Sequence, residues 1–226
     1  MVLPECGGAN EARNPPSPRV TSPPVPLGVV LFDLDGTLWE SPLRIDEVRR
    51  ELGLPADGRS LLEQIGSLAP EERARALAAL QAHEQRARAC GHLKPGTHEL
   101  LHFLRVQGIR TVLVTNNSRQ TAAEVLARTA LQFDLVRTRD DGPAKPDPRA
   151  FLEPLELLGV KTREAAVVGD SHLDLRAAWA AGIGQVVLVA PQAWMRAHFP
   201  GKARFYEVAT LEEARRVLAA LLNSRA

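Results

Sequence analysis

Residues 29–40 read VVLFDLDGTLWE, a short apolar run followed at once by two carboxylates. The apolar run at 29–32 predicts a buried strand of a parallel sheet. Asp33 and Asp35 come directly after it, with one residue between them. Because buried like charges destabilise one another, the pair indicates that a positive group lies beside the two carboxylates. Gly36 lets the backbone turn out of the sheet, which would leave both acids in the crevice where open α/β sheets bind ligands.

The composition is that of a globular protein with enough apolar residues for a full core, since 45% of the 226 residues are hydrophobic. The 28 basic and 27 acidic residues give a net charge of +1, so the chain has no charge footprint for nucleic acid or an anionic membrane. Cys6 and Cys90 form no CxxC motif, which fits a reducing cytosol. No apolar run approaches the roughly 20 residues that span a bilayer. We therefore expect a cytoplasmic protein whose partner is a small molecule.

The strand and helix patterns predict an α/β fold with a doubly wound, Rossmann-like sheet of five parallel strands. The predicted strands are Val29–Phe32, Thr111–Val114, Phe133–Val136, Ala165–Val168 and Gln185–Val189. Helical patterns lie at 96–106, 121–129, 151–158, 173–181 and 210–222. Thr121 with Glu124, and Thr210 with Glu213, have the spacing of a capping box that opens a helix.

Two further segments interrupt or precede this alternation. Residues 1–26 hold seven prolines and predict a disordered tail, with docking to a PPII-binding partner as a second interpretation. Residues 41–93 contain helical patterns at 43–52, 61–67 and 70–89 but no convincing strand. We expect this insert to form a small helical cap over a core made of 27–40 and 94–226. The alternative is a helical excursion packed to one side of the sheet.

Polar side chains follow four of the predicted strands. They are Asp33 and Asp35 after the first, Thr115, Asn116, Asn117 and Ser118 after the second, Lys145 beyond the third, and Asp170 and Asp174 after the fourth. Because the carboxyl ends of parallel strands meet at one edge of a sheet, we expect these groups to converge. Each has a structural alternative, such as a turn for Asp-Gly or a helix cap for Thr115.

This combination favours phosphate chemistry. Carboxylates alone would repel a phosphate, so the cluster indicates a hard divalent cation, most naturally Mg²⁺, between protein and substrate. With that charge neutralised by the cation and Lys145, an aspartate can attack phosphorus and form an aspartyl-phosphate. A second aspartate can protonate the leaving oxygen and later deprotonate the hydrolytic water. Thr115 and the backbone after it can donate hydrogen bonds to the non-bridging oxygens.

Four motifs occur in order along the chain. They are Asp33-Leu-Asp35-Gly36-Thr37-Leu38, Val114-Thr115-Asn116-Asn117, Lys145-Pro146-Asp147-Pro148 and Gly169-Asp170-Ser171-His172-Leu173-Asp174. Together they resemble the haloacid dehalogenase superfamily, specifically its phosphatase branch, over about residues 27–190. The resemblance implies Mg²⁺-dependent hydrolysis of a small phosphorylated metabolite.

The resemblance also implies a role for each matching residue. Asp33 would be the nucleophile and Asp35 the general acid and base. Thr115, Asn116 and Lys145 would contact the phosphoryl group. Mg²⁺ would be bound by Asp33, the carbonyl of Asp35 and Asp170, with Asp174 supporting it directly or through water.

Three rival functions stay open at this point. A haloacid dehalogenase of the same fold would have no need of Asp35, because a departing halide takes no proton. A phosphosugar mutase would use the same acids, although Thr37 resembles the phosphatase pattern more closely. A non-catalytic phosphate-binding scaffold would be expected to lack at least one member of the set, and none is missing.

Several other charged or titratable residues are weaker candidates. His98 and His102 have the i,i+4 spacing of zinc ligands but also that of an ordinary solvated helix face. His172 is expected at the rim of the cleft, where it would meet solvent or substrate. Arg44, Arg49, Arg59 and Arg119 are candidates for binding substrate charge, with an ordinary surface position as the alternative.

Overall fold

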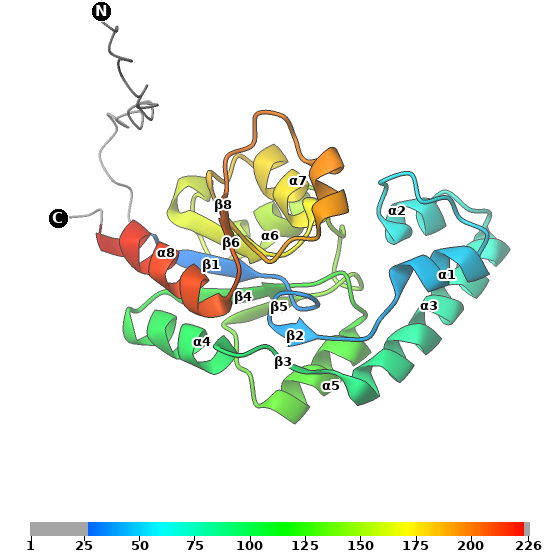
Figure 1. Cartoon of the computed structure of the whole chain (residues 1–226), viewed down its shortest axis with the longest axis horizontal. Coiled ribbons are helices and arrows are strands. Elements are labelled where there is room, and N and C mark those ends of the chain that lie inside the picture. Colours follow the sequence, from blue (N-terminus) through cyan, green and yellow to red (C-terminus); the bar gives the residue numbers. More distant parts are fainter. Residues whose placement is uncertain (1–26, 224–226) are drawn as a thin grey trace, which may run out of the picture.

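The computed structural model describes residues 27–223, so the proline-rich segment 1–26 lies outside the described residues. Its centre is a six-stranded sheet in the order β5-β4-β1-β6-β7-β8, with every neighbouring pair parallel (Figure 1). The strands are β1 (Val29–Phe32), β4 (Arg110–Val114), β5 (Leu135–Arg137), β6 (Ala165–Gly169), β7 (Gln185–Val189) and β8 (Tyr206–Val208). The doubly wound α/β prediction is confirmed, but the number of strands is six and not five.

Strand β8 is the one that the sequence pattern did not predict, because it contains no continuous apolar run. Tyr206 and Glu207 are exposed, and only Val208 is buried. It joins the sheet through parallel pairing with β7 at the edge, where one face of a strand can remain in water. The third predicted strand also begins later than expected, at Leu135. Phe133 precedes it and packs its ring against Phe32, with 6.3 Å between the ring centroids.

Helices cover both faces of the sheet. One face carries α4 (Thr97–Val106), α5 (Arg119–Thr129) and α8 (Leu211–Asn223), and the other carries α6 (Arg149–Leu157) and α7 (His172–Ala180). Strand β1 shows the alternation, because Val30 and Phe32 face the first layer while Val29 and Leu31 face the second. All four of these side chains are fully buried. The hydrophobic core therefore lies on both sides of β1 and holds its carboxyl end rigidly.

The helix after β4 starts earlier than its pattern indicated. Ser118 is the N-cap of α5 and accepts a hydrogen bond from the backbone N–H of Thr121 at 3.2 Å, so the predicted capping box of Thr121 and Glu124 is wrong. At α8, Thr210 accepts from the backbone N–H of Glu213 at 3.2 Å, but the Glu213 carboxylate accepts from Ala209 N–H. The early start of α5 brings its amino end directly against the second motif.

The insert after β1 is helical and has a hydrophobic cluster of its own. It contains α1 (Ile45–Glu51), α2 (Leu61–Gly66) and α3 (Pro70–Cys90), which lie to the right of the sheet in Figure 1. Val48, Leu61, Ile65, Ala76 and Leu80 form the cluster. Helix α3 also packs against α5 of the sheet domain.

The two connections to this insert pair with each other. Strand β2 (Trp39–Glu40) runs antiparallel to β3 (His92–Leu93). The expectation of no strand within 41–93 is therefore wrong for His92–Leu93, because a two-residue strand gives no periodic signal. The remaining elements are the 3-10 helices η1 (Thr162–Glu164) and η2 (Ala193–His198). Within residues 27–223, no helix has both the length and the apolar character needed to cross a membrane.

Gly91 lies where the two connections pack together. A Cβ atom on Gly91 would lie 2.4 Å from the buried indole ring of Trp39, a distance that forces the ring or the backbone to move. We expect Gly91→Ala to lower the free energy of unfolding by about 1–3 kcal/mol, the usual cost of overpacking. Urea unfolding measures it. Gly184→Ala is the control, because nothing lies within 4 Å of the added atom; equal losses in the two variants would contradict the explanation.

Candidate active site

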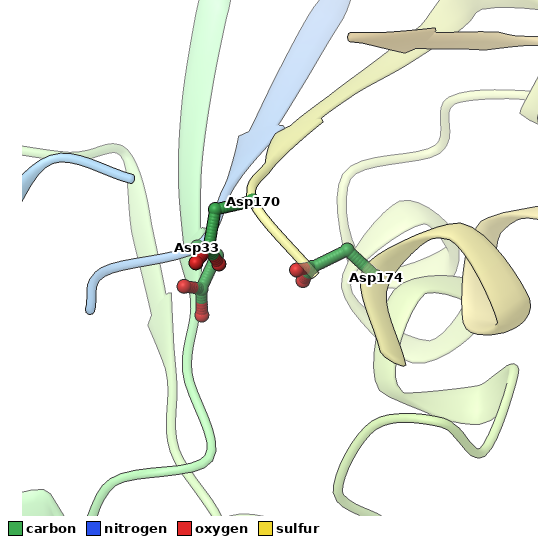
Figure 2. A group of neighbouring side chains, drawn as sticks. All are labelled: Asp33, Asp170 and Asp174. Atoms are coloured by element: carbon green, nitrogen blue, oxygen red, sulfur yellow. The ribbon is translucent and has the colours of Figure 1, made fainter. Parts of the chain in front are cut away.

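Three carboxylates meet at the carboxyl edge of the sheet. Asp33 follows β1, Asp170 follows β6, and Asp174 lies in the first turn of α7. Figure 2 shows the three side chains pointing toward one another, and ligand oxygens from all three lie within 4.8 Å of each other. They converge because β1 and β6 are neighbours in register, with the Asp33 N–H donating to the Val168 carbonyl at 3.0 Å.

Two glycines make room for these carboxylates. A Cβ on Gly36, which has a φ of +80°, would lie 2.1 Å from Oδ2 of Asp170. A Cβ on Gly169 would lie 2.5 Å from Cγ of Asp174. Both carboxylates therefore lie directly against bare backbone, and no larger residue fits at either position.

Lys145 supplies the positive charge that the acidic pair required. Its buried Nζ donates to Oδ1 of Asp33 and, at 2.7 Å, to Oδ1 of Asp174. The side chain of Asn116 holds the backbone of Lys145 in place, accepting from its N–H and donating to its carbonyl, both at 2.9 Å. The Asn116 amide thus contacts Lys145 through both of its polar atoms, and within the described residues its second Nδ2–H and its backbone N–H remain for a phosphate contact.

Burial and the repulsion between neighbouring carboxylates raise the pKa values of Asp33 and Asp170. Burial raises the pKa of Asp33 to about 6, with Asp174 adding to the effect and Lys145 opposing it. Burial, followed by the charges of Asp33 and Asp174, raises the pKa of Asp170 well above its usual range. Burial lowers the pKa of Lys145, but the two carboxylates it contacts outweigh this and raise it. A divalent cation among these oxygens would stabilise their ionised forms.

Asp170 and Asp174 differ in the hydrogen bonds that their carboxylates already accept. No side chain or backbone group within residues 27–223 donates a hydrogen bond to the Asp170 carboxylate. Asp174 is engaged on both oxygens, since Oδ1 accepts from Lys145 and Oδ2 accepts from the N–H and hydroxyl of Ser171 at 3.1 and 2.6 Å. The carboxylate oxygens of Asp33, Asp170 and Asp174 form a donor set that fits a hard cation such as Mg²⁺.

Asp35 is not part of the group formed by Asp33, Asp170 and Asp174. Its Oδ2 accepts a hydrogen bond from Nδ2 of Asn117. Burial and the charge of Asp33 raise the pKa of Asp35 to about 7, although the Asn117 hydrogen bond opposes the rise. A carboxyl with such a pKa can hold a proton near neutral pH and release it, as a general acid and base must. The sequence places Asn117 in the second motif, but nothing local shows that its side chain reaches Asp35, 82 residues away.

Thr115 directly follows β4. It is buried, its N–H donates to the Arg137 carbonyl at 2.9 Å, and its hydroxyl accepts from the N–H of Asn117 at 3.2 Å. Because the hydroxyl accepts in that bond, its own proton is still available to a substrate oxygen. The neighbouring Thr37 hydroxyl donates to Oδ2 of Asp33 at 3.5 Å.

His172 is buried, and it does not lie at the solvent rim where it was expected. Its Nε2 lies 3.3 Å from the Gly58 carbonyl of the insert, and its ring packs against Trp194 and His198 of η2. It therefore connects the insert to the sheet domain. His98 and His102 are exposed on α4, and among the described residues only Asp33, Asp170 and Asp174 form a group that could hold a metal.

The four arginine candidates lie outside this cluster of carboxylates. Arg49 is tied within the insert to the Gln64 side chain and the Arg59 carbonyl. Arg59 pairs with Asp57, and Arg119 pairs with Asp141. Arg44 is exposed just before α1.

Comparison with known proteins identifies relatives over most of the described chain. Residues 27–182 match the family model described as a haloacid dehalogenase-like hydrolase. A phosphoglycolate phosphatase of Pseudomonas savastanoi pv. phaseolicola is 34% identical over 186 residues, covering 71% of this chain and 68% of the relative. A plasmid-encoded phosphoglycolate phosphatase of Cupriavidus necator is 35% identical over 185 residues, covering 70% of this chain and 79% of the relative.

Solved structures show the same fold. A haloacid dehalogenase-like family hydrolase from Streptococcus pneumoniae superimposes with a TM-score of 0.63 at 21% identity, covering 86% of this chain and 98% of that chain. A hydrolase from Pseudomonas syringae gives a TM-score of 0.66 at 21% identity, covering 85% and 98%. These likenesses support the α/β architecture, and the sequence relatives above support a phosphatase.

Proposed function

The chain belongs to the haloacid dehalogenase-like hydrolases and is a phosphatase, and from that premise we propose that it hydrolyses a small phosphorylated metabolite in the cytoplasm with Mg²⁺. One observation carries the proposal. Asp33 lies in contact with the buried ammonium of Lys145 and beside Asp170, a carboxylate with no hydrogen-bond donor among the described residues. A nucleophile, a fixed positive charge and a free cation ligand thus lie within reach of one phosphoryl group.

We assign the ligands and the positioning residues as follows. Asp33, the carbonyl of Asp35 and Asp170 would hold Mg²⁺, which when bound neutralises the phosphoryl oxygens and withdraws charge from phosphorus. Asp174 orients Lys145 through its Oδ1, and it would support the cation directly or through water. Lys145, the Thr115 hydroxyl and the backbone N–H of Asn116 would bind the non-bridging oxygens.

Two chemical steps follow from this arrangement. In the first, a carboxylate oxygen of Asp33 forms a bond to phosphorus, the bond from phosphorus to the leaving oxygen breaks, and Asp35 gives that oxygen its proton. In the second, Asp35 takes a proton from water, the water oxygen bonds to phosphorus, and the aspartyl-phosphate bond breaks to restore the Asp33 carboxylate. The hydrogen bond from Asn117 keeps Asp35 on the leaving-group side in both steps.

The insert would act as a cap over these residues. We propose the division predicted above, with 41–93 as the cap and 27–40 with 94–226 as the catalytic core. The separate hydrophobic cluster of α1, α2 and α3 supports it, and so does the pairing of β2 with β3 at the base of the insert. A cap in this position would exclude water from the aspartyl-phosphate.

A phosphate-release screen tests the proposed function. Sugar, nucleotide and organic-acid phosphates, including phosphoglycolate, are incubated with the purified chain with and without Mg²⁺, and inorganic phosphate is measured. We expect release from at least one class with Mg²⁺ and a loss of about 100-fold or more after chelation, since carboxylates without the cation repel the substrate. Restoration by added Mg²⁺ is the control. No release from any class with Mg²⁺ would favour a non-catalytic phosphate-binding domain.

A further inference from the structure

A further buried carboxylate faces the site from the cap. Glu84 lies on α3, is only 3% exposed, and takes its partners from the core. Its two oxygens accept from the two terminal nitrogens of Arg139, and Oε2 also accepts from the Thr121 hydroxyl at 3.2 Å. Arg139 in turn donates to the Asn116 carbonyl at 3.1 Å. This ion pair joins the cap helix to the loop after β5, and Arg139 links that loop to the second motif.

Docking of the cap alone does not explain this charge. A buried ion pair gains little over apolar side chains of similar volume, because both charges lose their hydration. Helix α3 packs against α5 here, where apolar residues such as Val125 are available as partners. We therefore look for the role of this carboxylate in the space that its side chain faces.

Glu84 faces the space around Asp35. A small cavity between cap and core is lined by Asp35, Trp39, Ser41, Leu43, Glu84, Asn117, Thr121 and Val125. Its walls thus carry two carboxylates, with hydroxyl, amide and apolar groups, and none of its lining residues within the described chain is basic. Arg139 does not line the cavity; its two terminal nitrogens donate to Glu84, and one of them also donates to the Asn116 carbonyl.

In the proposed mechanism the leaving group would extend from Asp35 toward this cavity. Asp35 gives its proton to the leaving oxygen in the proposed mechanism, so the rest of the leaving group must lie on the Asp35 side. A carboxylate on the leaving group would lie near the Glu84 carboxylate, and no basic side chain lines the cavity to bind the leaving-group carboxylate. A hydroxyl or an ammonium on the leaving group would find hydrogen-bond acceptors there.

We propose that Glu84 is a specificity-determining residue that directs the enzyme to phosphomonoesters with an uncharged or cationic leaving group and against those with a carboxylate. This inference rests on the proposed function, because it takes Asp35 as the leaving-group acid. The proposal also predicts a substrate preference that differs from the names of the relatives called phosphoglycolate phosphatase, because phosphoglycolate carries a carboxylate.

Three substrates of nearly equal size test the proposal, namely phosphoglycolate, 2-hydroxyethyl phosphate and phosphoethanolamine. For the wild-type chain with Mg²⁺, we expect kcat/KM for each of the last two to exceed that for phosphoglycolate by at least about tenfold. Glu84→Gln keeps the side-chain size, removes the negative charge and leaves the positive charge of Arg139 unbalanced. Both changes favour a carboxylate on the leaving group, so the variant should narrow the ratio of kcat/KM values by about tenfold. Glu153→Gln is the matched control, because it breaks the Arg137 ion pair away from the cavity and should leave the ratio unchanged.

The possible outcomes separate the two proposals. A wild-type preference for phosphoglycolate, or an unchanged ratio in a folded Glu84→Gln variant, would overturn the role of Glu84 while leaving the phosphatase mechanism in place. If Glu84→Gln does not fold, as checked by circular dichroism, the ratio of kcat/KM values for the wild-type chain still tests the proposal, because a preference for phosphoglycolate would overturn it. No phosphate release from any phosphomonoester would overturn the proposed function, and this inference with it.

Discussion

Replacing Asp33 by Asn is expected to abolish phosphate release, with a fall in kcat of about 10⁴-fold or more, as for other lost nucleophiles. The amide has nearly the same shape but cannot attack phosphorus. Lys145 keeps its ion pair with Asp174, so the variant should fold. The measurement is kcat for the best substrate of the screen, with thermal unfolding as the check on folding.

A remote carboxylate provides the control for Asp33→Asn. Asp46 lies in the first turn of α1, and its side chain is 74% exposed. Asp46→Asn should therefore keep activity within about twofold, since surface substitutions away from special features have small effects. Turnover by a folded Asp33→Asn variant at more than a few per cent of wild type would remove Asp33 from the role of nucleophile.

Replacing Asp35 by Asn is expected to lower kcat by about 10²–10⁴-fold for alkyl phosphates, the range of general acid and base catalysis. The amide can still accept a hydrogen bond from Asn117, so the position of the side chain should be kept. Without a proton donor the alkoxide leaves slowly, and without a base the aspartyl-phosphate hydrolyses slowly.

A substrate with a good leaving group separates these two defects. p-Nitrophenolate departs without a proton, so with p-nitrophenyl phosphate only the second step should be slow. Rapid mixing of Asp35→Asn should then show a burst of about one nitrophenolate per active site, followed by slow turnover. A linear, uniformly slow time course would show that Asp35 does not serve the second step.

Much of the fold could be predicted because its signals are local. The four-residue run at 29–32 and the run at 165–168 are continuous apolar stretches, as expected for strands buried on both faces, and they became β1 and β6. Strand β8 escaped because two of its three residues face water. The start of α5 was misplaced because Ser118 and Thr121 both have cap-forming side chains, and only packing decides which one is used.

In the candidate site, too, features with local sequence signals could be predicted and features set by packing could not. Asp33, Asp170 and Asp174 were expected to converge because each follows or begins an element at the carboxyl edge of a parallel sheet, and they lie together. Glu84 gave no such signal. Its partner Arg139 is 55 residues away, and α3 shows no pattern that distinguishes Glu84 from its exposed acidic residues.

The sequence by itself determined the parallel sheet, the order of the four motifs and the acidic residues that gather at one edge. These follow from strand and turn patterns that act over a few residues, and from the common direction of parallel strands. Only the tertiary structure decided that Asn116 holds Lys145 and that Asn117 orients Asp35. It also decided that Glu84 and Asp35 line one cavity. Those contacts join distant segments, and their partners are selected by the packing of the cap on the core, which leaves no periodic trace in the chain.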